Sequence, residues 1–184
     1  MTKLRLLPWL CLLAMRAAAA AAPQDAGRFS VNGLAPAAAG QTLAQAEAAL
    51  GQPLKPEPLP PSRAASAATA GGPAASRCHH RLAERQPGVR YTLAGEVITR
   101  IETRDPRYST LSGLHVGDTV ARAQQVYGRR LVATPHPYFD HGKVLSVYTP
   151  DRRFALVMEA NDQGRIITLR GGRLPEVGWL EGCS

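Results

Sequence analysis

Aromatic residues, cysteines and acidic residues are all scarce in this sequence. Only 5% of its 184 residues are Phe, Trp or Tyr, and there are three cysteines. Much of the 45% hydrophobic content is alanine, which buries little area, so a large core is excluded and one ordinary domain is the expected size. Asp and Glu number 14 against 22 Lys and Arg, which gives a formal net charge of +8.

Sequence signatures of catalysis are also missing. There is no G-x-S-x-G turn, no phosphate-binding loop and no dinucleotide fingerprint. The apolar run near the start is shorter than the roughly 20 residues that a membrane-spanning helix needs. We therefore expect a protein that is not an enzyme, holds no cofactor and has no membrane span.

The first 22 residues predict an export signal. Lys3 and Arg5 precede the apolar run 6–15, and an alanine tract with A-x-A cleavage sites follows. Removal of residues 1–22 takes away three cations and no acid, so the net charge falls from +8 to about +5. A basic protein outside the cytoplasm meets acidic proteins or anionic envelope polysaccharide rather than nucleic acid. We expect it to be periplasmic or secreted.

Two cysteines remain after the signal is removed. Cys11 lies within the signal, whereas Cys78 and Cys183 form an even pair. In an oxidising compartment such a pair predicts a disulfide bond.

An internal repeat is the strongest pattern in the chain. GQTLAQAEAALG at 40–51 matches GDTVARAQQVYG at 117–128 in length, in its flanking glycines, in the threonine and in the apolar positions. Thr42 and Thr119 are placed as N-caps, and Gln45 completes a capping box in the first copy. Each copy therefore predicts a short helix with one buried stripe, ended by a glycine.

A second pair of motifs follows the helices in the same order. GEVIT from Gly95 matches GRIIT from Gly164, and each follows a β-prone stretch, 89–93 or 154–159, and a turn-forming sequence. Each copy thus predicts an antiparallel hairpin after its helix. Further strands are expected at 78–83 and 143–149, with 177–183 as a terminal strand or tail. In 143–149, Val144 and Tyr148 should lie on one face and Leu145 and Val147 on the other.

These elements predict an α+β fold of two tandem helix-plus-antiparallel-hairpin repeats, which form a sheet with the short helices packed on one face. Between the first helix and its hairpin, residues 52–77 are rich in Pro and Ala, and this composition predicts a disordered insertion. The expected segments are the signal at 1–22, the helical part of the first repeat at 23–51, the insertion at 52–77, the first hairpin sheet at 78–110 and the second repeat at 111–184.

The G-x-T-x-x-x-A helix with its closing glycine and following hairpin resembles the SmpA/OmlA (BamE-like) envelope fold. Two such units in tandem, exported and disulfide-bonded, resemble the β-lactamase inhibitor proteins. The resemblance covers 31–103 and 111–183. It implies a protein partner, either in envelope assembly or as an inhibited exported enzyme. A bond between Cys78 and Cys183 would join the two repeats.

Basic and aromatic side chains are the candidate binding residues, because Arg and aromatic residues are enriched at protein interfaces. If the two hairpin sheets join side by side, these side chains line an exposed face. The candidate set is Arg100, Tyr108, Arg130, Tyr138, Tyr148 and Arg152. We expect a non-enzymatic protein-binding module, and a lectin-like binder of envelope glycan is the second hypothesis.

A small metal-binding protein or hydrolase is the third hypothesis. His136, Asp140 and His141 lie close together in a proline-braced loop and offer ligands for zinc or copper, although 140–142 is equally a turn between strands. His79 and His80 follow Cys78, but neighbouring residues of a strand point to opposite faces and cannot serve one site.

Overall fold

The computed structural model describes residues 27–58 and 78–181. The expected export signal, most of the expected insertion and Cys183 lie outside these residues. Among the described residues, no helix has the length and apolar character needed to cross a membrane.

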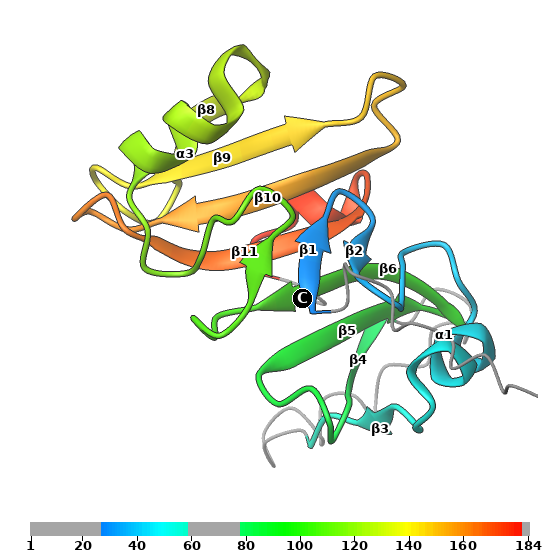
Figure 1. Ribbon diagram of the computed structural model, residues 1–184. Helices are drawn as coiled ribbons and strands as arrows, with labels where there is room; N and C mark the ends of the chain where they lie inside the picture. The colour runs from blue at the N-terminus through cyan, green and yellow to red at the C-terminus, as the bar shows by residue number, and fades with distance from the viewer. Residues whose placement is uncertain (1–26, 59–77, 182–184) are drawn as a thin grey trace, which may run out of the picture.

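An eight-stranded antiparallel sheet forms the body of the molecule (Figure 1). Its strand order is β3-β4-β5-β6-β11-β10-β9-β8, so the last strands of the first and second halves of the chain pair at the centre. The strands are β3 Lys55–Pro56, β4 Cys78–Leu82, β5 Val89–Ala94, β6 Val97–Thr103, β8 Val132–Pro135, β9 Lys143–Tyr148, β10 Phe154–Ala160 and β11 Ile166–Arg173.

A small second sheet lies in front of the middle of the large one (Figure 1). It contains β1 Arg28–Ser30, β2 Gly33–Leu34 and β7 Ser109–Thr110 in the order β2-β1-β7. The two sheets approach closely at Gly171 of β11, where an added Cβ would lie 2.2 Å from the Ser30 carbonyl oxygen. Only glycine permits this contact, which places the small sheet against the centre of the large one.

Two α-helices, α1 Leu43–Leu50 and α3 Val120–Tyr127, form where the repeat predicts them. The predicted capping box is confirmed, because Thr42 Oγ1 accepts from Gln45 N (3.3 Å) and Gln45 Oε1 accepts from Thr42 N (2.9 Å). Gly51 ends α1 in the left-handed conformation, as predicted. Gly128 differs: its φ is 54° but its ψ is −128°, and the chain continues into the 3₁₀ turn η2 Gly128–Arg130.

The segments before the two helices bind the sheet in the same way. In each half, a glycine N–H donates to an isoleucine carbonyl of the last strand, and that isoleucine N–H donates back to the residue after the glycine. The hydrogen bonds are Gly40 N to Ile98 O (2.7 Å), Ile98 N to Gln41 O (2.9 Å), Gly117 N to Ile166 O (2.7 Å) and Ile166 N to Asp118 O (2.8 Å). Each helix is thereby tied to its own hairpin.

The main core lies between the large sheet and the layer of helices and small sheet. Ala46 of α1 and Ala123 of α3 are fully buried against it, together with Met158 of β10. The predicted alternation in β9 is confirmed, since Leu145 and Val147 enter this core, whereas Val144 and Tyr148 pack around Val177 on the opposite face. The predicted α+β class is thus confirmed.

One expected boundary is wrong. The segment from Gln52 does not leave the fold: β3 pairs with β4, and Leu54 is only 1% exposed, with its N–H bonded to Glu47 Oε1 (2.8 Å). The insertion therefore starts after residues that belong to the core, and 59–77 lie outside the described residues. Residues 177–183 were expected as a terminal strand or tail; the described part is the 3₁₀ turn η3 Glu176–Gly178 followed by residues without regular structure up to 181, which fits the tail.

Candidate functional site: a charged row on the open face of the sheet

The sheet face opposite the helices carries charged side chains on its central strands. Arg100 and Glu102 lie two residues apart in β6 and therefore share this face. The strand register puts an arginine opposite Glu102 on both sides, Arg90 of β5 and Arg170 of β11. Glu159 of β10 extends the line. We call Arg90, Arg100, Glu102, Glu159 and Arg170 the charged row.

Ion pairs link every member of the charged row. Glu102 Oε1 contacts Arg90 Nη1 at 3.2 Å, and its Oε2 contacts Arg100 Nη2 at 3.1 Å and Arg170 Nε at 3.2 Å. Arg170 Nη2 is also paired with Glu159. At the outer end, Arg90 Nη2 binds Glu57 Oε1 at 2.7 Å. The three arginines of the row therefore face its two glutamates and Glu57, and these six side chains together are electrically neutral.

The centre of the charged row is buried. The side chains of Arg100 and Arg170 are each 2% exposed. Burial lowers the pKa of Arg170 to about 10, partly offset by Glu102. Burial alone would raise the pKa of the Glu102 carboxyl, but Arg100, Arg170 and Arg90 together hold it below its usual value. All these groups are therefore charged at neutral pH.

The end of the described chain crosses this face. The Trp179 carbonyl accepts hydrogen bonds from Arg100 Nη1 (2.5 Å) and Arg170 Nη1 (3.4 Å). Val177 packs beside it against Ala155 and Val157. The C-terminal segment is therefore held down by the arginines of the charged row, and the centre of the row is a structural network rather than a free surface.

His136 closes the inner end of the network. Its Nε2 lies 3.4 Å from Glu159 Oε2, and its Nδ1 accepts from the Tyr138 N–H at 3.1 Å. An Nδ1 that accepts a hydrogen bond carries no proton, so the geometry selects the neutral imidazole. Burial, reinforced by Arg170, lowers the pKa of His136, which agrees with this form.

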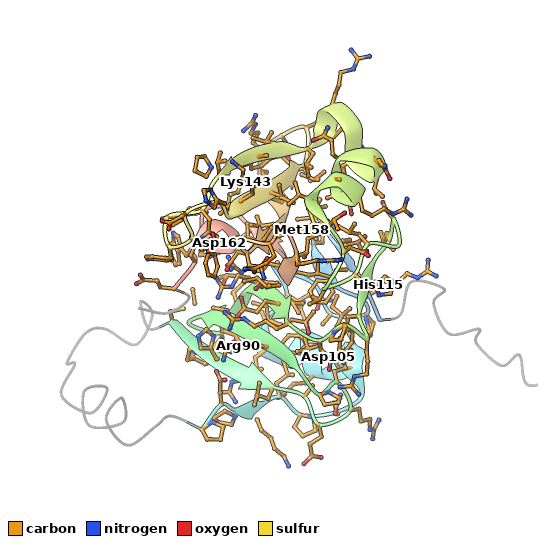
Figure 2. The ribbon with its side chains drawn as sticks, turned by 90° about the vertical axis from the view of Figure 1, so that its left-hand side faces the viewer. Arg90, Asp105, His115, Lys143, Met158 and Asp162 are labelled. Atoms are coloured by element: carbon orange, nitrogen blue, oxygen red, sulfur yellow. The ribbon has the colours of Figure 1, made fainter. Side chains whose placement is uncertain are left out.

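Two adjoining pockets lie at the outer end of the charged row. The first, about 340 Å³ in volume, is lined by the charged residues Glu57, Arg90, Glu102 and Arg104 together with Leu82, Gly88, Val89 and Thr103. The second, also about 340 Å³, is mainly apolar and includes Pro56, Pro58, Ala83 and Pro87. They share Leu82, Gly88 and Val89. Figure 2 labels Arg90 in the half of the molecule that holds these pockets, and Met158 in the other half.

The structure does not bring the predicted binding residues onto one face. Arg100 is buried in the charged row, and Tyr108 packs against Phe29 of the small sheet, with its hydroxyl bonded to Pro87 O. Arg130 lies on η2 after α3. Only one pair of the set comes together: the Arg152 guanidinium lies 4.5 Å from the Tyr148 ring centre.

Tyr138 is the remaining aromatic residue of the set, and two aromatic residues outside it, Trp179 and Tyr91, differ in exposure. Tyr138 is 63% exposed, and its hydroxyl is hydrogen-bonded to Glu181. Trp179 is half exposed, and Tyr91 is completely buried in the main core.

The alternative metal site does not form. His136 is directed at Glu159, whereas Asp140 and His141 are exposed in the following loop, where the His141 N–H binds Asp162 Oδ1 (2.9 Å). Within 27–58 and 78–181, no group of three or more His, Cys, Asp or Glu side chains is arranged to hold a metal ion. The predicted partner of Cys78, Cys183, lies outside these residues, so the disulfide stays a prediction.

The acids and two of the arginines of the charged row were missed by sequence reasoning. The signal that could have found them is the alternation Arg100-x-Glu102 inside a predicted strand, since opposite charges two residues apart on one face indicate ion pairing there. Glu159 ends a predicted strand, but its partner, Arg170, is contributed by a strand whose register no local pattern reveals.

Comparison of the chain with models of protein families, with curated proteins and with solved structures finds no match.

Proposed function

We propose that this chain is an exported, non-enzymatic binding protein that docks another protein on the two adjoining pockets at the outer end of its charged row. The observation that carries this proposal is the direct contact between a charged pocket and an apolar pocket, which share Leu82, Gly88 and Val89. Binding hot spots of protein–protein interfaces combine a buried apolar anchor with an oriented charge. The two pockets offer both features side by side.

The charges in the first pocket favour a carboxylate from the partner. Glu57 and Glu102 are already paired with Arg90. Arg104 is exposed, and among the described residues it forms no ion pair. A carboxylate placed on Arg104 gains a partner without breaking the existing network, whereas an incoming cation would compete with Arg90.

The apolar pocket is suited to receive a side chain. Its walls include three prolines, Pro56, Pro58 and Pro87. Proline fixes the backbone φ angle, so little conformational entropy remains to be lost when the pocket is filled.

We also propose that the large sheet consists of two tandem repeats. The matching hydrogen bonds of Gly40 with Ile98 and of Gly117 with Ile166 support this. So do the two hairpins, because each has one register shift, at Thr92/Leu93 and at Glu159/Ala160. The likeness to SmpA/OmlA and β-lactamase inhibitor proteins, and with it the choice between an assembly factor and an inhibitor, belongs to the same proposal.

The test is affinity capture with matched baits. The wild-type protein, a pocket variant (Arg104→Ala with Leu82→Ala) and a control variant (Arg129→Ala with Leu111→Ala) are exposed to an envelope extract of the producing organism. The control removes the same side-chain types from η2 and from the segment after β7. Bound proteins are identified by mass spectrometry, and bound sugars are analysed separately.

We expect one saturable protein on the wild-type and control baits and at least a tenfold weaker signal on the pocket variant. Equal capture by all three baits would place the docking surface elsewhere. Polysaccharide without protein would replace the proposal by the glycan-binding hypothesis, and an empty wild-type bait would count against binding of either kind in the envelope.

A further inference from the structure

A third pocket, on other residues than the docking pockets, has a composition of its own. Its volume is about 510 Å³, and it is bounded by the β9–β10 turn, the end of β11 and the Leu174–Glu176 segment, with Gly40 at its rim. Three arginines line it, Arg152, Arg153 and Arg173, against one acid, Glu176. The lining therefore carries two uncompensated positive charges.

Within residues 27–58 and 78–181, one of the three guanidiniums is neutralised by an acid. Arg173 binds Glu176 Oε1 through both Nε (3.0 Å) and Nη2 (2.7 Å). Arg152 and Arg153 form no ion pair with any described residue. Asp151, the nearest acid along the chain, accepts from Thr149 Oγ1 (2.6 Å) and from the Arg153 N–H (3.1 Å), and so fixes the turn rather than a guanidinium.

Aromatic rings hold the two unpaired arginines in place. Arg152 lies over Tyr148 with its guanidinium carbon 4.5 Å from the ring centre, and Arg153 lies 5.9 Å from that of Phe154. Such stacking occupies the flat face of a guanidinium and leaves its in-plane N–H donors available. The site is thus ordered before a ligand arrives, which lowers the entropic cost of binding.

The backbone supports the same arrangement at a cost. Arg152 has φ 55°, which makes it the one residue other than glycine with a positive φ among the described residues. A non-glycine side chain is disfavoured there. Glycine or asparagine would fit this turn better, so the backbone conformation does not account for an arginine at this position.

We propose that this pocket binds the phosphate group of a small phosphate ester, with Arg152 and Arg153 as its ligands. A phosphate monoester carries a charge of about −1.5 to −2 at neutral pH, which matches the excess charge of the lining. Arginine also presents paired N–H donors that suit phosphate oxygens. The pocket is of ligand size and much larger than a phosphate ion, so it has room for the organic substituent.

The experiment titrates the purified protein with inorganic phosphate and with glycerol 3-phosphate at constant ionic strength, by calorimetry and by NMR of the arginine Nε–H and backbone amide signals. Arg152→Gln with Arg153→Gln removes both charges and keeps most of the side-chain volume. Arg129→Gln with Arg130→Gln is the matched control, because it also neutralises adjacent arginines, one of which lies over an aromatic ring, Tyr127, at 6.0 Å.

We expect saturable binding of glycerol 3-phosphate at roughly 1 mM. The signals that shift should be those of 149–154 and 173–176, inorganic phosphate should bind more weakly, and the Arg152/Arg153 variant should lose about 10- to 100-fold in affinity. The control variant should match the wild type. If inorganic phosphate binds as tightly as the ester, the site is for free phosphate and the ester proposal is wrong. Equal loss in both variants, or no saturation by either probe, overturns the site itself. None of these results bears on the docking pockets, which use other residues.

Discussion

Glu102 shows how a single residue can hold one face of a sheet together. Its carboxylate contacts three arginines from three strands. Two of these arginines, Arg100 and Arg170, have almost completely buried side chains. Buried charges are costly to move out of water, and apolar replacements of a whole network are often at least as stable. Removal of one charged residue should therefore cost much more stability than the complete network contributes relative to apolar residues.

Replacement of Glu102 by Gln should lower the free energy of unfolding by roughly 3 to 5 kcal/mol, because the buried Arg100 would lose its carboxylate partner and Arg170 would keep only Glu159. Urea denaturation at pH 7 measures this. Glu84→Gln is the control, since Glu84 pairs with Lys55 on the exposed edge and its loss should have a much smaller effect. A Glu102→Gln variant as stable as the control would show that the row is not energetically coupled.

His136 should make stability depend on pH below neutrality. Its pKa in the folded protein is lowered, so the unfolded chain binds a proton more readily, and stability is lost as the pH falls below about 6.5 towards the folded value. His80, whose pKa burial also lowers, acts in the same direction. The lowered pKa of Glu102 has its effect in a separate window, below its ordinary value of 4.5.

His136→Gln should therefore flatten the stability profile between pH 7 and pH 5, measured as urea midpoints at half-unit intervals. His141→Gln removes an exposed histidine of the same loop and should keep the wild-type slope. Identical slopes in both variants would mean that folding does not change the pKa of His136.

Among the helices and strands, those marked by characteristic residues at their ends could be predicted from the sequence, and those without such residues could not. The helices α1 and α3 were predictable because their caps are written within a few residues, as in Thr42 and Gln45. The edge strand β3 was not, because Lys55–Pro56 lies in a proline-rich stretch and is only two residues long. Proline is tolerated at sheet edges, so a proline-rich composition did not exclude pairing. Leu54, an apolar residue between Pro53 and Lys55, was the available clue.

Leu54→Ala tests whether this edge contributes to the fold. We expect a loss of about 2 to 5 kcal/mol in the free energy of unfolding, because the side chain is fully buried and its removal leaves a cavity. Leu111→Ala is the control, since Leu111 is 46% exposed. Equal stability of the two variants would show that Gln52–Glu57 do not contribute to the fold and belong to the insertion, as the sequence alone predicted.

For the whole molecule, the sequence predicted two similar units but not how they would meet. The hydrogen bonds equate Ile98 with Ile166, one residue away from the match between the GEVIT and GRIIT motifs. A short motif cannot fix register to one residue, and an error of one residue exchanges the two faces of a strand. The sequence also did not predict that the C-terminal segment would cross the face opposite the helices, where it covers Arg100.

The predicted Cys78–Cys183 bond would act at this scale, because it closes a loop of about 100 residues and would stabilise the fold by roughly 4 to 5 kcal/mol in the chain-entropy model. Peptide mapping of the unreduced protein should recover the two cysteines in one linked peptide. Reduction should then lower the urea midpoint. Free thiols at both positions in the protein purified from outside the cytoplasm would refute the bond.

The central pairing of β6 with β11 also determines what a partial chain can do. A chain that ends after β6 exposes an unpaired strand whose Arg100 and Glu102 have lost Arg170 and the Trp179 carbonyl. Open strand edges recruit other strands, and the strand with the matching charges is β11 of another copy. In nascent or proteolysed chains this exposed edge favours domain swapping, in which β6 of one molecule pairs with β11 of another. A swapped dimer would reproduce every ion pair of the monomer.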